Sequence, residues 1–272
     1  MSTVPNRVID TNDTGGGIDG TIRNAAWLTA IYNSIEEMAY TVIIPTSTGT
    51  QNNWTPGVVG NTVIKCNNAS LLTITGIVGT VVTGHRLIIM SIGAGQVDLV
   101  YSSGSSSVGN KLINFATTGL TSLAAGAGVA EYVYDGSRWV MVSHEQGAPI
   151  TPTFAAGDYT SPTGTWAVTA GEAAILTYYL RGRQLTVTYE VSLTTVTGTP
   201  AHLRRKIPGG ATGAAGNSFQ PTRVSDNGGG VVWGMAIAST ADIQFFSTVG
   251  GGGWAASTLL TTVQGVYTVT IL

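Results

Sequence analysis

The residues best able to do chemistry in this chain are few and far apart. The three histidines, His85, His144 and His202, make neither an H-x-H nor an H-x-x-x-H spacing, which is what a zinc site on one strand or helix would need. The sequence offers little that would serve as a nucleophile with its base or as a pair of carboxylates. All three histidines are therefore expected on the surface or in loops. The sequence predicts a protein that is not an enzyme and holds no metal and no cofactor.

Two glycine- and aspartate-rich patterns near the start of the chain come closest to ligand motifs. Residues 15–20 read Gly-Gly-Gly-Ile-Asp-Gly and precede a predicted helix, but the Lys-Ser/Thr pair of a phosphate-binding loop is missing. Asp10, Asp13 and Asp19 lack the D-x-D-x-D-G spacing of a calcium loop. We expect a flexible lead-in with solvated carboxylates.

Binding chemistry has better candidates than catalysis. Arg204, Arg205 and Lys206 form the one local concentration of charge, suited to an acidic sugar, a phosphate or a neighbouring subunit. Trp233 and Trp254 each have one glycine neighbour, which helps to leave a ring face accessible for stacking. These five residues are the candidate receptor-binding set. The alternatives are a solvated turn for the basic cluster, and core or subunit packing for the tryptophans.

Charge and composition exclude several classes of protein. Twelve basic residues stand against 14 acidic ones, with a net charge of −2 and no basic stripe, so nucleic acid is not an expected partner. The chain has no run of about 18 consecutive apolar residues, which is what a membrane-spanning helix needs. The first twenty residues show no secretory signal pattern, which predicts synthesis in the cytosol. The single cysteine, Cys66, cannot form an intramolecular disulfide.

One segment has a helical period. Leu28, Ile31, Ile35 and Met38 follow at spacings of 3, 4 and 3 within residues 21–40, which predicts a short helix with one apolar stripe. The stripe either packs on its own domain or bundles with copies of itself. Residues 1–40 are predicted to be an N-terminal anchor segment, and the four stripe residues are the oligomerisation candidates.

From residue 41 onward the period is two, with short β-branched and aromatic runs separated by Gly, Ser, Asn and Pro. Prolines and a glycine in residues 146–152 indicate a linker. The fold prediction is mainly β: the short N-terminal α-helix is followed by two antiparallel β-sandwich, jelly-roll-like domains at 41–147 and 153–272. No internal repeat is expected between the halves. The predicted strands are 61–65, 71–77, 86–92, 96–101, 131–134, 138–142, 174–180, 185–193, 231–238, 242–247 and 266–272.

Charged residues make up only 10% of the chain. A monomeric β-protein with so few charges exposes strand edges that invite aggregation, and burial between subunits removes that liability. Closed rotational symmetry is the ordinary solution, and the helical stripe fits a threefold assembly. We therefore expect a homotrimer.

Several short motifs resemble those of bacteriophage virion fibres, of the tail-fibre, head-fibre or receptor-binding kind. Residues 84–99 and the hairpin Tyr134-Asp-Gly-Ser-Arg-Trp139 are similar to a small β-domain frequent in such fibres. Residues 182–189, 196–200 and 206–210 are similar to terminal β-domains of phage and prophage fibres. The N-terminal helix resembles virion-anchoring segments.

The resemblance implies a homotrimeric, non-enzymatic tail fibre or spike that is assembled in the host cytoplasm and located in the virion. Its N-terminal segment would contact other virion proteins, residues 41–147 would be a spacer, and the C-terminal tip would bind the host surface, with a cell-surface glycan as partner. The loops at 201–216, 225–230 and 250–254 are the expected binding positions. The alternatives are a head-decorating fibre or other capsid or tail component without a receptor role and, ranked last, a glycan-cleaving enzyme, because no long β-helix with acidic clefts is expected.

Overall fold

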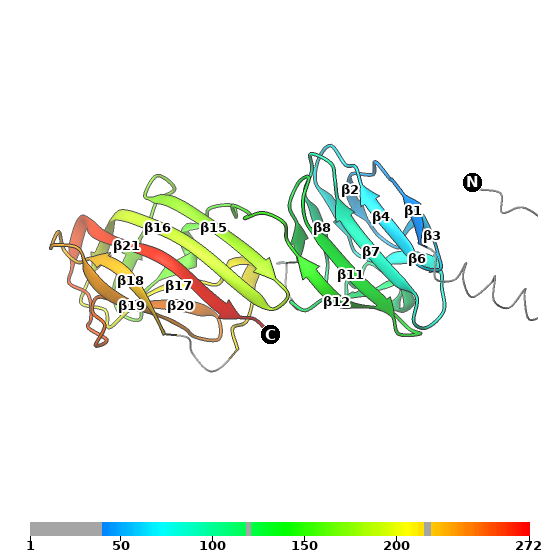
Figure 1. Ribbon diagram of the computed structural model, residues 1–272. Helices are drawn as coiled ribbons and strands as arrows, with labels where there is room; N and C mark the ends of the chain where they lie inside the picture. The colour runs from blue at the N-terminus through cyan, green and yellow to red at the C-terminus, as the bar shows by residue number, and fades with distance from the viewer. Residues whose placement is uncertain (1–39, 118–120, 215–218) are drawn as a thin grey trace, which may run out of the picture. The chain divides into compact units, whose positions relative to one another are not determined.

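The structure is a computed structural model that describes residues 40–117, 121–214 and 219–272 (Figure 1). Residues Thr41–Leu272 form one compact unit. The predicted N-terminal helix, with Leu28, Ile31, Ile35 and Met38, lies outside the described residues. All described strands belong to this unit, which is mainly β as predicted.

The first eight strands wind as a parallel β-solenoid. They stack in three sets, β1-β4-β7, β2-β5-β8 and β3-β6, and every pairing within a set is parallel. Thr41 pairs with Thr62, and Thr62 pairs with Leu87, so successive coils are 21 and then 25 residues apart. The strands are β1 (Thr41–Ile43), β2 (Gly49–Gln51), β3 (Trp54–Val59), β4 (Thr62–Cys66), β5 (Leu72–Ile74), β6 (Ile77–Thr80), β7 (Arg86–Ser91) and β8 (Val97–Leu99).

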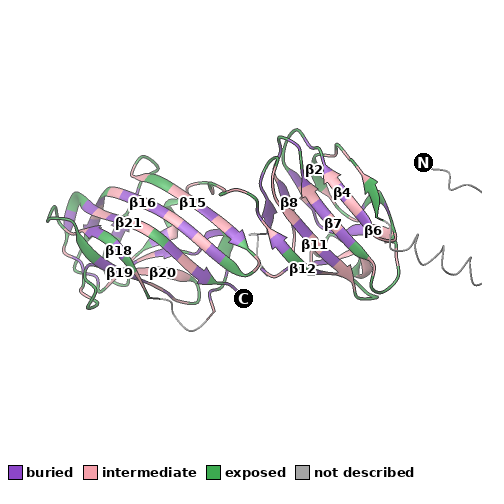
Figure 2. Ribbon diagram, viewed as in Figure 1, coloured by how far each residue is buried: buried purple, intermediate pink, exposed green. Residues whose placement is uncertain are grey.

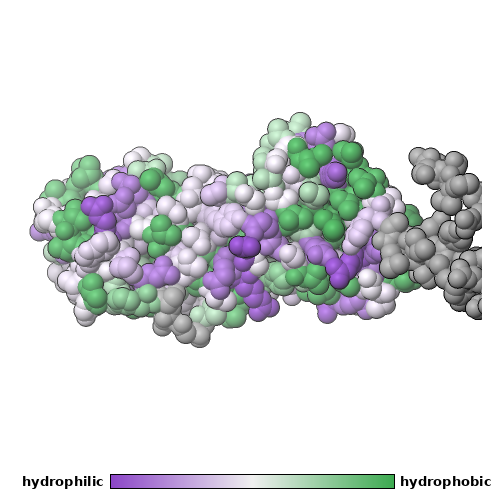
Figure 3. Space-filling view, in the orientation of Figure 1, coloured by the Kyte–Doolittle hydropathy of each residue, from purple (hydrophilic) through white to green (hydrophobic). Residues whose placement is uncertain are grey.

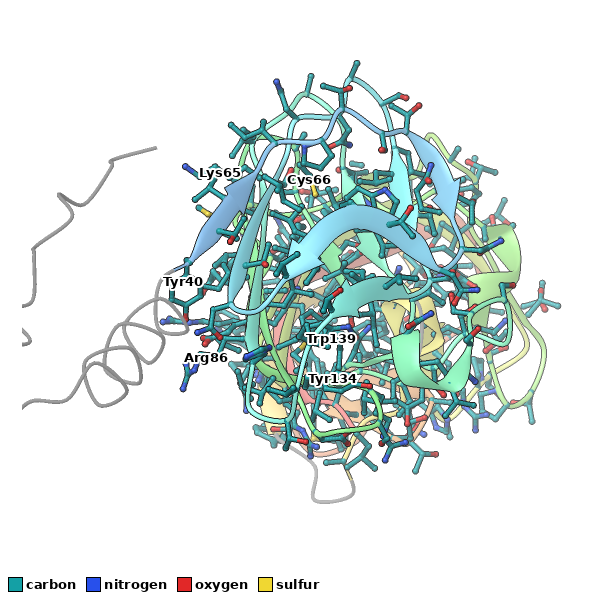
Figure 4. The ribbon with its side chains drawn as sticks, turned by 90° about the vertical axis from the view of Figure 1, so that its right-hand side faces the viewer. Tyr40, Lys65, Cys66, Arg86, Tyr134 and Trp139 are labelled. Carbon is teal, nitrogen blue, oxygen red and sulfur yellow. The ribbon has the colours of Figure 1, made fainter. Side chains whose placement is uncertain are left out.

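In-register stacking places apolar residues directly above one another inside the coils. Ile64 pairs with Ile89, and both are fully buried. Ile74 pairs with Leu99 on a second side of the solenoid, and both are buried. Because side chains alternate along a strand, Lys65 and Arg86 point outward while Cys66 points into the core (Figure 4). The strands with alternating apolar residues thus enclose a buried core inside the solenoid.

A hairpin completes this half of the chain. Strand β11 (Val129–Tyr134) pairs antiparallel with β7 and with β12 (Trp139–Glu145). The predicted turn at Asp135-Gly136 is confirmed: the Asp135 carboxylate accepts hydrogen bonds from the N–H groups of Ser137 and Arg138, both at 2.8 Å, and Gly136 has φ 99°. The remaining elements are η1 (Val108–Asn110), β9 (Leu112–Ile113) and β10 (Ser122–Leu123).

The C-terminal half is antiparallel. Its strands follow the order β15-β16-β21-β18-β19-β20-β17-β13, and β14 pairs with the far end of β16. The elements are η2 (Ala156–Asp158), β13 (Tyr159–Thr160), β14 (Thr165–Ala167), β15 (Ala173–Arg181), β16 (Gln184–Thr197), β17 (Leu203–Lys206), η3 (Pro208–Gly210), β18 (Phe219–Ser225), β19 (Val232–Ala238), β20 (Asp242–Phe246) and β21 (Ser257–Thr270).

The prediction of two antiparallel jelly-roll-like sandwiches is therefore wrong. Residues 41–99 pair in parallel, coil upon coil, and only the later part of the chain is dominated by antiparallel pairs. The physical reason is that a period of two marks a strand with one buried face whatever the direction of its neighbour. Whether neighbouring strands run parallel depends on how the strands recur along the chain. In this chain the repeat is short and its length is irregular.

The core of the C-terminal half lies beneath the long strands β16 and β21. Leu185, Val187, Tyr189 and Val191 alternate with more exposed residues along β16, and this banding is visible in Figure 2. They pack in one cluster that also contains Trp166, Phe245, Trp254 and Tyr267. The predicted strand at 185–193 is confirmed and extends over 14 residues.

The ladder between β16 and β21 is interrupted by bulges. Its register shifts between Val191 and Thr194 and again between Thr194 and Val196. Leu193 has φ 58° and Leu259 has φ 55°, although left-handed backbone is costly for a residue with a branched side chain. Both side chains are more than half exposed.

Gln146 joins the two halves at the start of the predicted linker. Its side chain is fully buried and donates hydrogen bonds to the carbonyls of Ala148, at 2.8 Å, and Tyr178, at 2.9 Å. Close backbone approach beside it requires a glycine, since a Cβ on Gly147, at φ 91°, would lie 2.2 Å from the backbone nitrogen of Gly128.

Candidate functional site

The predicted basic cluster lies in a strand. Residues 203–206 form β17, so Arg204, Arg205 and Lys206 alternate between its faces. Arg205 is only 1% exposed, with its guanidinium 5.8 Å from the centre of the Tyr159 ring and Nη1 donating to the Lys206 carbonyl. Its burial removes it from any receptor contact in this conformation. The expectation of one basic loop patch is corrected by strand alternation.

The two outward members of the cluster have partners of their own. Arg204 Nε lies 2.7 Å from Nε2 of His202. Lys206 Nζ lies 3.8 Å from the carboxylate of Asp158 and is half exposed. Such an exposed pair contributes little to stability.

The two candidate tryptophans have opposite environments. Trp254 is 2% exposed, and its indole N–H donates to the Phe245 carbonyl at 2.9 Å, which makes it a core residue. Trp233, in β19, is 61% exposed. Of the two, only Trp233 offers a ring face to a ligand.

Residues in and beside the predicted binding loops are hydrogen-bonded to one another. The backbone N–H of Trp254 donates to the carbonyl of Pro200, and the backbone N–H of Ala255 lies 3.1 Å from both carboxylate oxygens of Asp226. Desolvation raises the pKa of Asp226. Residues 226–231 connect β18 and β19, whereas part of the expected loop at 201–216 is strand β17 and η3. These bonds involve Pro200, just before the first predicted loop, and Ala255, just after the third.

The histidines are not clustered. His144 is 3% exposed, contrary to the expected surface position, because a β-bulge at Val142 interrupts the alternation of β12 and turns His144 inward. Its Nε2 lies 3.2 Å from the Ser122 carbonyl, and burial lowers its pKa to about 4. Within the described residues, no group of three His, Cys, Asp or Glu side chains could hold a metal ion.

A groove of about 610 Å³ lies across the outer face of the sheet formed by β15, β16, β21, β18 and β19. Its central feature is a cross-strand row, one residue per strand, set by the ladder register. The row runs Ile175, Glu190, Gln264, Arg223 and Trp233. Figure 3 shows the outer surface of β15, β16 and β21, with single apolar residues set among polar and neutral ones.

Toward one end of the row lies the hydrogen-bond acceptor Glu190, and at the other end lie the cationic Arg223 and the aromatic Trp233. Gln264 Nε2 donates to the Glu190 carboxylate at 3.3 Å. Arg223 is exposed and has no ion pair among those described. The exposed Trp233 is directly opposite Arg223 in the β18–β19 ladder. Directly opposed residues on one sheet face have Cβ atoms about 4.5–5.5 Å apart, so one ligand can touch both side chains.

Sequence reasoning missed Glu190, Gln264 and Arg223. The polar face of the strand at 185–193 marks Glu190 as outward-facing, but β18 was not predicted and β21 was predicted only from residue 266. The row exists because three segments far apart in the sequence are in register. That register has no local signal in the sequence.

Comparisons with protein-family models, with curated proteins and with solved structures found no match. Among the helices in the described ranges, none is long and apolar enough to cross a membrane.

Proposed function

We propose that this protein is a structural virion appendage, a phage tail fibre or spike, whose C-terminal half binds the host surface. The single observation that carries the binding role is the groove in which exposed Trp233 lies beside the unpaired Arg223. Flat aromatic rings flanked by charged and amide side chains recognise sugar surfaces through stacking and hydrogen bonds.

The groove supports binding better than hydrolysis. Glu190 is the only carboxylate among the side chains that line it, and glycoside hydrolysis ordinarily uses two carboxylates on opposite sides of the bond. In this proposal the protein is not an enzyme. Residues 41–147, which begin with the solenoid at 41–99, serve as the spacer between the anchor segment and the binding half.

The proposed assembly is a homotrimer held to other virion proteins by residues 1–40. The low share of charged residues, 10% of the chain, supports burial between subunits. Light scattering after gel filtration tests this. We expect three times the 28.0 kDa chain mass, and a monomer at micromolar concentration contradicts the trimer.

Binding of fluorescently labelled full-length protein to a panel of bacterial strains, read by flow cytometry, tests the receptor role. We expect a subset of strains to be labelled, and a Trp233→Ala variant of equal oligomeric state to label them weakly. Absence of labelling on every strain contradicts host binding and favours a structural component without a receptor role.

A further inference from the structure

The charge of Arg223 is the starting point for the ligand of the groove. Arg86, Arg138, Arg181 and Lys206 each lie within 4.0 Å of a carboxylate, and Arg223 is outside this set. It is exposed on β18, on the rim of a groove rather than in a turn. The planar guanidinium fork matches a carboxylate or a phosphate in a bidentate manner.

The opposite charge in the groove, Glu190, forms no ion pair with Arg223 among those described. Glu190 is on β16 and Arg223 on β18, with β21 between them. Neighbouring strands are about 4.8 Å apart, so two steps separate the backbones of these residues by about 10 Å. In addition, the Glu190 carboxylate already accepts from Gln264. An anion bound at Arg223 would therefore contact the guanidinium and the Trp233 ring, with the Glu190 carboxylate farther away.

The groups beside Arg223 suit a sugar. Trp233 offers an exposed ring face on one side. On the other side, Gln264 uses its amide nitrogen for Glu190, which leaves its carbonyl oxygen to accept from a hydroxyl. Thr188 and Glu190 continue the polar lining along β16.

We propose that this groove binds an oligosaccharide that carries an anionic group, a carboxylate or a phosphate, paired with Arg223 while the sugar ring stacks on Trp233. Hydroxyls farther along the ligand hydrogen-bond to Gln264 and Glu190. This inference rests on the proposed host-binding function and specifies the ligand class for it.

Isothermal titration of the full-length protein with four probes tests the proposal. Trigalacturonate carries carboxylates, galactotriose is its neutral counterpart, and mannose 6-phosphate and mannose form the phosphate pair. We expect one anionic probe to bind about tenfold or more tightly than its neutral counterpart, with affinity falling as salt is raised from about 50 to 500 mM. The pair that shows the preference identifies the source of the charge.

Two variants assign the effect to the groove. Arg223→Gln should remove the anionic preference while leaving binding of the neutral sugar, and Trp233→Ala should weaken both by about threefold to tenfold. Arg86→Gln on β7 and Phe219→Ala outside the groove lining are the matched controls, with circular dichroism to confirm folding. Neither control should change affinity.

Equal binding of anionic and neutral sugars, no binding of either anionic probe, or an unchanged preference in Arg223→Gln overturns the inference. These outcomes are distinct from failure of the proposed function. Cell labelling that persists with no anionic preference leaves host binding in place and removes only the ligand class.

Discussion

The side-chain oxygen of Gln146 accepts a hydrogen bond from the backbone N–H of Leu180, at 3.2 Å, and so ties the end of the first half of the protein to strand β15. Both residues are buried. A buried donor that loses its partner costs about 1–3 kcal/mol, which makes this contact a measurable part of the stability.

Replacement of Gln146 by Leu should therefore lower the free energy of unfolding by about 2–3 kcal/mol, because Leu180 loses its acceptor and a buried carbonyl loses a donor. Urea denaturation followed by circular dichroism measures this. Gln184→Leu, at an exposed position of β16, is the matched control and should change stability by less than about 0.5 kcal/mol. Equal effects at the two sites would refute the structural role of Gln146.

Acid should weaken the protein through His144. Burial lowers the pKa of its imidazole to about 4 from 6.5, so between these values the unfolded chain binds a proton that the folded chain does not. The free energy of unfolding keeps its full value above pH 6.5 and falls by about 3 kcal/mol in total as the pH drops toward 4. Urea midpoints at pH 7 and pH 4.5 measure the loss. A His144→Gln variant should show a flatter pH dependence than a His85→Gln variant, and parallel profiles for the two would count against this origin.

Cys66 should be unreactive in the folded protein. Burial raises the pKa of its thiol to about 12, and only the thiolate attacks disulfide reagents. At pH 8 we expect no reaction with Ellman's reagent over an hour in buffer and one thiol per chain in 6 M guanidinium. Rapid labelling of the native protein would show that the solenoid interior opens readily.

Replacing either of the two leucines that have left-handed backbone with glycine should stabilise the protein. Leu193→Gly and Leu259→Gly remove an unfavourable φ at exposed positions, and after the added chain entropy of glycine each should stabilise the protein by about 0.5–1 kcal/mol. Leu260→Gly, at the next position and without positive φ, should destabilise it. Thermal unfolding compares the three, and a loss of stability in all of them would mean that the leucine side chains hold the bulge.

Strand content was predictable because the signal is local. The alternation at residues 185–193 and the Asp135-Gly136 turn depend on neighbours within a few positions, and both are confirmed. Strand direction was not predictable from alternation. One clue was present: the tripeptide Thr-Val-Ile occurs at 41–43 and again at 62–64, and the structure pairs these copies residue by residue.

The candidate site was predictable only in part. Trp233 was identified by type, but the same reasoning selected Trp254 and Arg205, which the fold buries. Whether an aromatic or an arginine points inward depends on strand phase, and a one-residue shift reverses it. Arg223 and Gln264 become neighbours through pairing of β18 with β21, a long-range event with no local signature.

The coiled arrangement of residues 41–99 also bears on how such a chain can change length. Each coil stacks its strands on the previous one, with Thr41, Thr62 and Leu87 in one column. Duplication or loss of one coil would alter the height of the column by about 4.8 Å and leave the lateral faces in phase. Evolution or a protein engineer can therefore adjust reach in fixed increments, without redesigning the groove-bearing half.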